Sequence, residues 1–179
     1  MPTARFTTTI LSNLEATTPL ELRSAKRADV AAIAAMQKAS LLETYEPFLG
    51  RAAVEEFIAE GQVERYFEEH WHQATVATSG GEIEGVAVLV GAVLDLIWVR
   101  PESRSQGIGA SLLRAVESKA AVEGNVLTLE VWDVNQRALA FYERSGFSVI
   151  ATTEDRETGL DKLLMRKKLP RSARVHSRR

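Results

Sequence analysis

Apolar residues alternate with polar ones along some stretches of the chain, and along others they recur at every third or fourth position. Alternation over residues 20–24, "LELRS", predicts a short strand. Asp29 is a suitable N-cap for a helix that the apolar spacing continues to about Ala39. We expect residues 41–50, "LLETYEPFLG", to form a loop with exposed aromatics, either a lid or a packed connection. Residues 50–71 have a helical pattern, bent or broken at an internal glycine.

The middle of the chain changes to a β pattern and then returns to a helix. Residues 74–99 predict strands separated by turns, one at "SGG" and one at Gly91. An amphipathic helix is predicted after Gly107, with Gly124 as its stop signal.

The last third of the chain predicts a strand, a short helix and two further strands. The strand covers residues 126–131, and Asn135 is placed to cap a helix that ends near Gly146. Residues 147–154 and 162–169 are expected to form a strand pair. This order of elements indicates an α/β (α+β) fold, with a mixed, mostly antiparallel central sheet flanked by helices.

The chain is long enough for one domain with a substantial core, at 179 residues. We expect that domain over residues 20–169, after a loose, threonine-rich arm over residues 1–19. Residues 170–179 are expected to form a basic tail. The tail is interpreted as a solvated end, with nucleic-acid binding as the alternative.

Composition narrows the classes of function. The formal net charge is −2, so the molecule has no general attraction for nucleic acid or for an anionic membrane. The chain has no cysteine, which excludes disulfides, thiolate metal sites and a cysteine nucleophile. The longest apolar run, residues 86–99, is too short and interrupted to span a bilayer, and the first residues make a poor secretory signal. We therefore expect a cytoplasmic protein with no nucleic-acid or membrane partner.

Two glycines stand at the junction between the strand ending near Val99 and the following helix. Gly107 and Gly109 allow a sharp turn and a close backbone approach. The unpaired N–H groups of the first helical turn, together with the helix dipole, favour a phosphate or pyrophosphate there. Arg104 adds a positive charge. A P-loop string is absent, and a Rossmann fingerprint lacks its third small residue because Leu112 stands in that place.

Three segments together resemble one enzyme family. "RSQGIG", residues 104–109, has the form [RQ]-x-x-G-x-[GA] and resembles the acetyl-CoA-binding motif of the GCN5-related N-acetyltransferase (GNAT) superfamily. "LRSAKRAD", residues 22–29, is similar to the R-x-A-x-x-x-D start of that family. "VNQRALAFYERSGF", residues 134–147, is similar to its N-x-x-A-x-x-F-Y-x-x-x-G-F signature. The resemblance covers about residues 20–169.

The resemblance implies direct transfer of acetyl from acetyl-CoA to an amine, with no covalent enzyme intermediate and no metal. It also implies which residues hold the cosubstrate. The loop and first helical turn that hold the pyrophosphate are Arg104, Ser105, Gln106, Gly107, Ile108, Gly109 and Ala110. Main-chain groups near Ile97, Trp98 and Val99 would contact the pantetheine arm or the acetyl carbonyl, provided that strands 93–99 and 126–131 splay apart. Asn135 is either a helix cap or a further CoA contact.

Catalytic candidates follow from the same resemblance. Tyr142 matches the tyrosine that protonates the leaving thiolate in this family. Glu130, in "LTLEVW", is the first candidate for the general base and Asp95, in "AVLDLIWV", is the second. Glu84 or a chain of water molecules is the remaining option.

The sequence leaves the acceptor of the acetyl group undetermined. The first two helices of the family and the loop between them often shape the acceptor site. Four glutamates recur every fourth residue there, Glu56, Glu60, Glu64 and Glu68, either as an acidic stripe for a cationic amine or as a solvated face. A small amine, a polyamine and a peptide or protein N-terminus are all compatible. The alternative function is a non-catalytic acyl-CoA-binding sensor or partner domain. Dimers are common in the family, so a homodimer is also compatible.

Overall fold

The computed structural model describes residues 19–170 of the chain. The expected arm over residues 1–19, apart from its last residue, and the expected basic tail after Pro170 lie outside the described residues. Among residues 19–170, no helix has both the length and the apolar character needed to cross a membrane.

Strands, α-helices and three short 3₁₀ turns (η) follow one another along the chain. The strands are β1 (Glu21–Ser24), β2 (Ala74–Ser79), β3 (Glu82–Val90), β4 (Val93–Val99), β5 (Val126–Trp132), β6 (Ser148–Glu154) and β7 (Asp161–Lys168). The helices are α1 (Val30–Leu49), α2 (Arg51–Ala59), α3 (Gln62–His70), α4 (Ile108–Glu123) and α5 (Gln136–Arg144). The 3₁₀ turns are η1 (Arg27–Asp29), η2 (Trp71–Gln73) and η3 (Pro101–Ser103).

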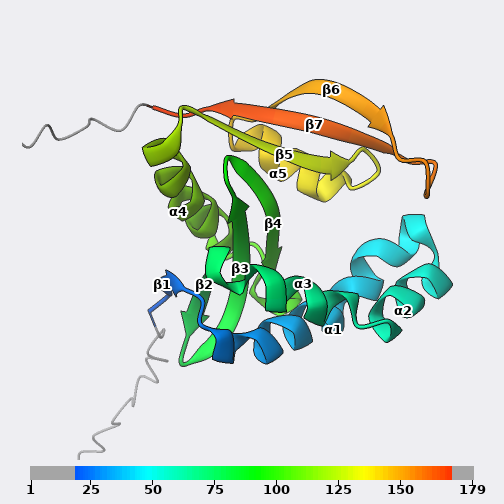
Figure 1. Cartoon of the computed structure of the whole chain (residues 1–179), viewed down its shortest axis with the longest axis horizontal. Helices are drawn as coiled ribbons and strands as arrows, with labels where there is room; N and C mark the ends of the chain where they lie inside the picture. The colour runs from blue at the N-terminus through cyan, green and yellow to red at the C-terminus, as the bar shows by residue number, and fades with distance from the viewer. Residues whose placement is uncertain (1–18, 171–179) are drawn as a thin grey trace, which may run out of the picture.

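The seven strands form one sheet in the order β1-β2-β3-β4-β5-β7-β6. Every neighbouring pair is antiparallel except β4 and β5, which are parallel. The predicted mixed, mostly antiparallel sheet is therefore confirmed. β4 and β5 register only at Val93 and Thr128, where the Thr128 N–H donates to the Ala92 carbonyl at 3.0 Å. Beyond this point the two strands part, and Figure 1 shows β5 and β7 turning away from β4.

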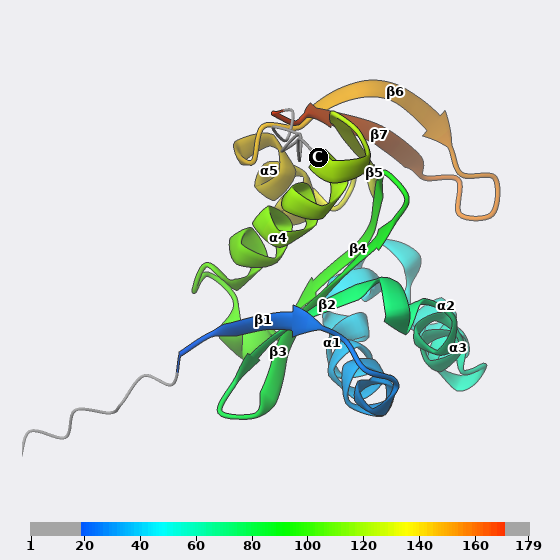
Figure 2. The ribbon, with the colours of Figure 1, turned by 60° about the vertical axis from the view of Figure 1, so that its left-hand side comes forward.

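Two apolar cores lie on opposite sides of the sheet because neighbouring residues of a strand point to opposite faces. On β3, Val86 and Val88 pack with α1 and α3, whereas Ala87 between them packs on the side of α4. Figure 2 shows α4 on one side of β3 and α1 on the other. The first core belongs to the N-terminal half, and the second joins α4 to β5, β7 and α5.

Helix α1 is longer than its sequence pattern predicted. The expected loop over residues 41–50 is wrong, because the helix runs unbroken to Leu49 and ends at Gly50. Leu41 is buried, and Tyr45 and Leu49, each four residues further on, pack against the same core, so the apolar face continues. Pro47 stands in the last turn, where it removes only one helical hydrogen bond.

The other predicted elements agree with the structure. The helical stretch over residues 50–71 is broken as expected, since Gly61 adopts a left-handed φ of 71° between α2 and α3. Asn135 caps α5 with its side-chain oxygen, which accepts from the Ala138 N–H at 3.2 Å. β6 and β7 pair antiparallel as expected.

Candidate active site

A cleft of about 900 Å³ opens where β4 and β5 part. One end of it is formed by the loop between η3 and α4 together with the start of α5. The rest of it is lined by the C-terminal half of α1 and by residues of β4 and β5. The cleft therefore joins segments from both halves of the sheet.

The glycine loop has the backbone that the sequence predicted for an anion site. Gly107 is the N-cap of α4 with a left-handed φ of 81°, and Ser105 has the unusual φ of 63° for a residue with a side chain. Gly107, Gly109 and Ala110 all line the cleft. The free N–H groups at the start of α4 are thus close to this end of the cleft, which suits a phosphate.

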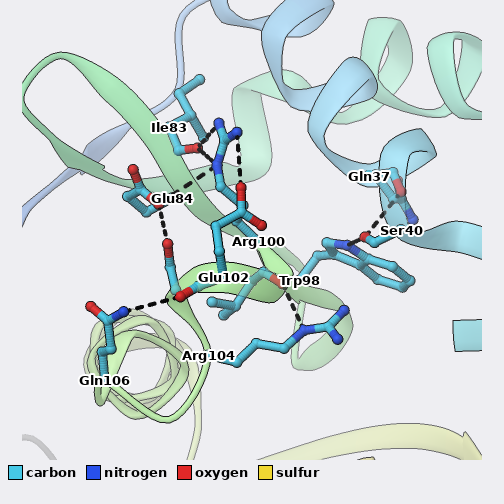
Figure 3. Close-up of polar contacts among 11 residues, drawn as sticks. Gln37, Ser40, Ile83, Glu84, Trp98, Arg100, Glu102, Arg104 and Gln106 are labelled. Atoms are coloured by element: carbon cyan, nitrogen blue, oxygen red, sulfur yellow. Dashed lines mark hydrogen bonds and ion pairs between the residues drawn. The ribbon is translucent and has the colours of Figure 1, made fainter. Parts of the chain in front are cut away.

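Side chains behind the loop hold it against β3 (Figure 3). The Arg100 guanidinium donates to the Ile83 carbonyl, at 2.8 Å from Nη2, and lies 3.6 Å from the Glu84 carboxylate. The Ser103 hydroxyl donates to Glu84, and the Gln106 amide donates to the Glu102 carbonyl at 3.1 Å. Glu84 is not among the cleft-lining residues, so its position does not support the option of a general base.

Two guanidinium groups stand beside the loop. Arg104 Nη1 donates to the Glu43 carboxylate of α1 at 2.6 Å, and Arg104 Nε donates to the Val99 carbonyl at 3.3 Å. Arg137 lines the same end of the cleft, where burial and then the positive charge of Arg104 lower its pKa. Sequence reasoning missed Arg137, whose only signal was a basic residue at a position that the 134–147 pattern leaves unspecified.

The β4 segment of the predicted cofactor site lies along the middle of the cleft. Ile97, Trp98 and Val99 all line it, and beyond Val93 the strand edge that faces β5 has no partner strand. The Trp98 side chain is buried on the α1 side, where its Nε1 donates to Ser40 Oγ at 2.9 Å. Figure 3 shows this contact between α1 and β4. The backbone of β4 is therefore held on one side and open on the other.

Tyr142 is buried in α5 and lines the cleft. Burial, and to a smaller extent the neighbouring Tyr45, raise its pKa above that of an ordinary phenol. A raised pKa favours the neutral form, so the hydroxyl is protonated throughout the physiological range. Tyr142 can consequently donate a hydrogen bond in the cleft, although it is a weaker acid than a free phenol.

The two candidate bases lie on the two strands that part. Asp95 on β4 and Glu130 on β5 are both exposed and both line the cleft. Asp95 accepts a hydrogen bond from the Tyr66 hydroxyl of α3 at 2.5 Å, and burial followed by this bond raises the pKa of Tyr66. Within residues 19–170, Glu130 has neither a side-chain hydrogen bond nor an ion pair. Glu130 is therefore the carboxylate with both oxygens available.

An aromatic cluster that the sequence did not predict also lines the cleft. The ring of Tyr45 lies 5.5 Å from that of Phe48 and 5.5 Å from that of Trp132, and Phe48 and Trp132 are 5.8 Å apart. Tyr45 and Phe48 come from α1, whereas Trp132 ends β5. The aromatics of residues 41–50 were a signal, but their contact with Trp132 depends on the tertiary fold.

The glutamates of α2 and α3 do not form a stripe along the cleft. The helix is interrupted at Gly61, and none of these glutamates lines the cleft. Glu64 is paired with Lys38, and Glu68 lies 3.2 Å from Arg27. Among the described residues, no group of three or more His, Asp or Glu side chains is placed to hold a metal ion.

Comparisons with known proteins agree on one family. The family model described as "Acetyltransferase (GNAT) domain" matches residues 32–169. The chain is 30% identical over 139 residues to the uncharacterized N-acetyltransferase YhfO of Bacillus subtilis, covering 72% of this chain and 89% of that protein. It is 31% identical over 80 residues to the peptidyl-lysine N-acetyltransferase YiaC of Escherichia coli, covering 45% of this chain and 52% of that protein. The fold is similar to PaiA N-acetyltransferase of Thermoplasma acidophilum in complex with coenzyme A, with a TM-score of 0.71, 19% identity, and coverage of 84% and 99% of the two chains.

Proposed function

Because this chain belongs to the GNAT acetyltransferase family and is an acetyl-CoA-dependent N-acetyltransferase, we propose that it transfers acetyl directly to a primary amine. The candidate acceptors are a small amine, a polyamine or a peptide N-terminus. The observation that carries the proposal is the parting of β4 and β5 beside the start of α4, with Tyr142 lining the same cleft. We further propose that residues 20–169 are the catalytic domain.

The cosubstrate would lie along the cleft from the glycine loop toward Glu130. The backbone from Gln106 to Ala110 would receive the pyrophosphate, helped by the helix dipole of α4. Arg137 is exposed beside the loop and would add a charge-assisted contact, and Arg104 would do so if it exchanged Glu43 for phosphate. The open edge of β4 would hold the pantetheine arm and the acetyl carbonyl, where a main-chain N–H would stabilise the developing oxyanion.

Acetyl transfer to an ammonium removes two protons from nitrogen and returns one to sulfur. An alkylamine is mostly protonated at neutral pH, so Glu130 would accept the first proton from the ammonium, directly or through water. The amine nitrogen then forms a bond to the thioester carbonyl carbon, its second proton passes to water, and the carbon–sulfur bond breaks with its electron pair on sulfur. The products are the N-acetylated amine and CoA.

Tyr142 is proposed to act at the leaving sulfur. Its raised pKa makes full proton transfer to a thiolate, whose conjugate thiol has a pKa of about 8.5, unfavourable. The hydroxyl would instead stabilise the thiolate by donating a hydrogen bond until a proton arrives from solvent. Asn135 keeps its role as the cap of α5, and a contact with CoA remains a proposal for it.

The absence of cysteine makes the test direct, because a thiol reagent then reports released CoA without a background from the protein. We would follow CoA release from acetyl-CoA with a panel of primary amines and with their tertiary N,N-dimethyl analogues. Release only with the primary amines, together with the N-acetylated products by mass spectrometry, is the expected result. Acetyl-CoA binding without release for any amine would contradict the proposal and favour a non-catalytic acyl-CoA-binding domain.

A further inference from the structure

We propose that the acceptor is an arylalkylamine, a primary amine carried on an aromatic ring, and that Tyr45, Phe48 and Trp132 select it. This inference rests on the proposed function, since it names the substrate class of the same cleft. The three side chains are called the ring wall below.

The ring wall lines the cleft in which the acceptor must meet the acetyl group. The glycine loop is assigned to the pyrophosphate, so the amine has to reach the acetyl group past cleft residues that the cosubstrate does not cover. Tyr45, Phe48 and Trp132 line the cleft, and all three are half-buried. Their mutual contacts are mostly edge-to-face, with interplanar angles of 86° for Tyr45–Trp132 and 72° for Phe48–Trp132. Half-buried rings in this arrangement can offer a further aromatic group an edge or a face.

The charges in the part of the cleft proposed for the acceptor favour an ammonium group. Asp95 and Glu130 line the cleft, and within residues 19–170 neither forms an ion pair. One of the cations that line the cleft, Lys162, is bound to Asp155 at 2.5 Å, and its Nζ lies 5.7 Å from the centre of the Trp132 ring. Two available carboxylates beside aromatic rings provide the pairing that an alkylammonium needs.

Two polar atoms of the cleft indicate that the aromatic ring of the acceptor carries a polar group. Trp132 Nε1 and Thr44 Oγ1 are shielded from solvent and have no hydrogen-bond partner within the described residues. Such groups are normally satisfied. Because both residues line the cleft, a hydroxyl or ring nitrogen on the acceptor could pair with one of them once the rings move apart.

The same walls are less suited to a polyamine. A polyamine carries several separated ammonium groups and needs carboxylates along its length. In the cleft, Glu43 is already bound to Arg104, and apart from Asp95 and Glu130 the part proposed for the acceptor offers rings. An arylalkylamine carries a single ammonium group, which could pair with Asp95 or Glu130 while its aromatic ring contacts the ring wall.

The test compares matched amines. We would measure kcat/KM for 2-phenylethylamine, 2-cyclohexylethylamine, spermidine and a lysine peptide, using CoA release and product mass. The expected result is a preference of about tenfold for phenylethylamine over cyclohexylethylamine, the size that one or two aromatic contacts supply. Trp132→Leu, which keeps an apolar side chain, should reduce that ratio to about two. Trp71→Leu is the control, since Trp71 does not line the cleft, and the ratio should stay as in the wild type.

The two proposals fail in different ways. Equal rates for the phenyl and cyclohexyl amines, or a preference for spermidine or the peptide, would overturn the arylalkylamine assignment and leave amine acetylation intact. If acetyl-CoA binds but no amine turns over, the proposed function is wrong. Calorimetry of phenylethylamine with the CoA-bound protein then tests whether the ring wall binds an arylalkylamine. Binding that is lost in Trp132→Leu supports it, and no binding by the wild type overturns it.

Discussion

The two ends of the cleft are built in different ways. At the glycine-loop end, the backbone and helix N-terminus of one continuous segment provide the main binding groups, Arg104 and Arg137 stand beside them, and the Arg100 side chain holds the segment against β3. The part proposed for the acceptor is assembled from α1, β4 and β5, and the groups proposed to bind the acceptor are side chains. A backbone site suits a cosubstrate that never changes, whereas a side-chain site can change its substrate by single substitutions.

The largest effect is expected where the two ends meet, at Tyr142. Tyr142→Phe removes the hydroxyl and should lower kcat by about 100-fold, in the range of a single proton-transfer group. The dissociation constant for acetyl-CoA, measured by calorimetry, should change little. Burial raises the pKa of Tyr142, so the neutral hydroxyl is present at every pH below its ordinary value of about 10. The wild-type rate should therefore not fall from tyrosine ionisation below that pH, and equal kcat for the variant would remove Tyr142 from the mechanism.

The next effect separates the two carboxylates. Glu130→Gln should lower kcat by about tenfold or more, and raising the pH should partly restore the rate because more of the amine is then neutral. Asp95→Asn should mainly raise KM for the amine, since Tyr66 already occupies one Asp95 oxygen. The measurement is a pH profile of kcat and KM for both variants. The reverse pattern would make Asp95 the base.

A smaller effect is expected from loosening the glycine loop alone. Ser103→Ala removes the hydroxyl bound to Glu84, at a cost of about 1 kcal/mol for a lost hydrogen bond. Acetyl-CoA should bind about threefold to fivefold more weakly, while the relative rates for different amines stay the same. Ser118→Ala, on the exposed side of α4, is the control. A changed amine preference in Ser103→Ala would mean that the two ends are not independent.

The smallest effect has the opposite sign and concerns the ion pair that links the ends. Glu43→Gln should release Arg104 and tighten acetyl-CoA binding by about twofold to threefold at low salt, with the gain fading as salt screens the charges. Glu46→Gln is the control on the same helix, since Glu46 pairs with Arg51. Binding measured by calorimetry at two salt concentrations is sufficient. Weaker binding in Glu43→Gln would show that Arg104 depends on Glu43 for its position.

The same contrast explains what the sequence could predict. The loop, the cap of α5 and the start of α4 depend on neighbouring residues, so local signals such as Gly107 and Asn135 were sufficient. Most strands, and the pairing of β6 with β7, also followed from alternation and turns. The helical end of α1 was missed, although the apolar spacing continued past Pro47 to Leu49.

The ring wall and Arg137 needed the tertiary structure. Tyr45 and Trp132 are far apart in sequence and meet only because β5 turns away from β4. The choice between an acidic stripe and a solvated face for the glutamates of α2 and α3 also needed the fold, since the pairing of Glu64 with Lys38 depends on how the helices pack. A site that is formed by side chains of distant segments therefore cannot be predicted from local sequence patterns and needs the tertiary structure.

The most direct measurement is the calorimetric titration of acetyl-CoA into the wild type, Gly107→Ala and Gly107→Glu. Both variants place a side chain at the same left-handed φ of 81°, and a Cβ there meets no atom within 4 Å, so the backbone strain is matched. Only glutamate adds a negative charge where the pyrophosphate is expected. Binding by the wild type and by Gly107→Ala, with binding abolished in a folded Gly107→Glu, is the predicted result. Unchanged binding in Gly107→Glu would show that the loop does not receive the pyrophosphate.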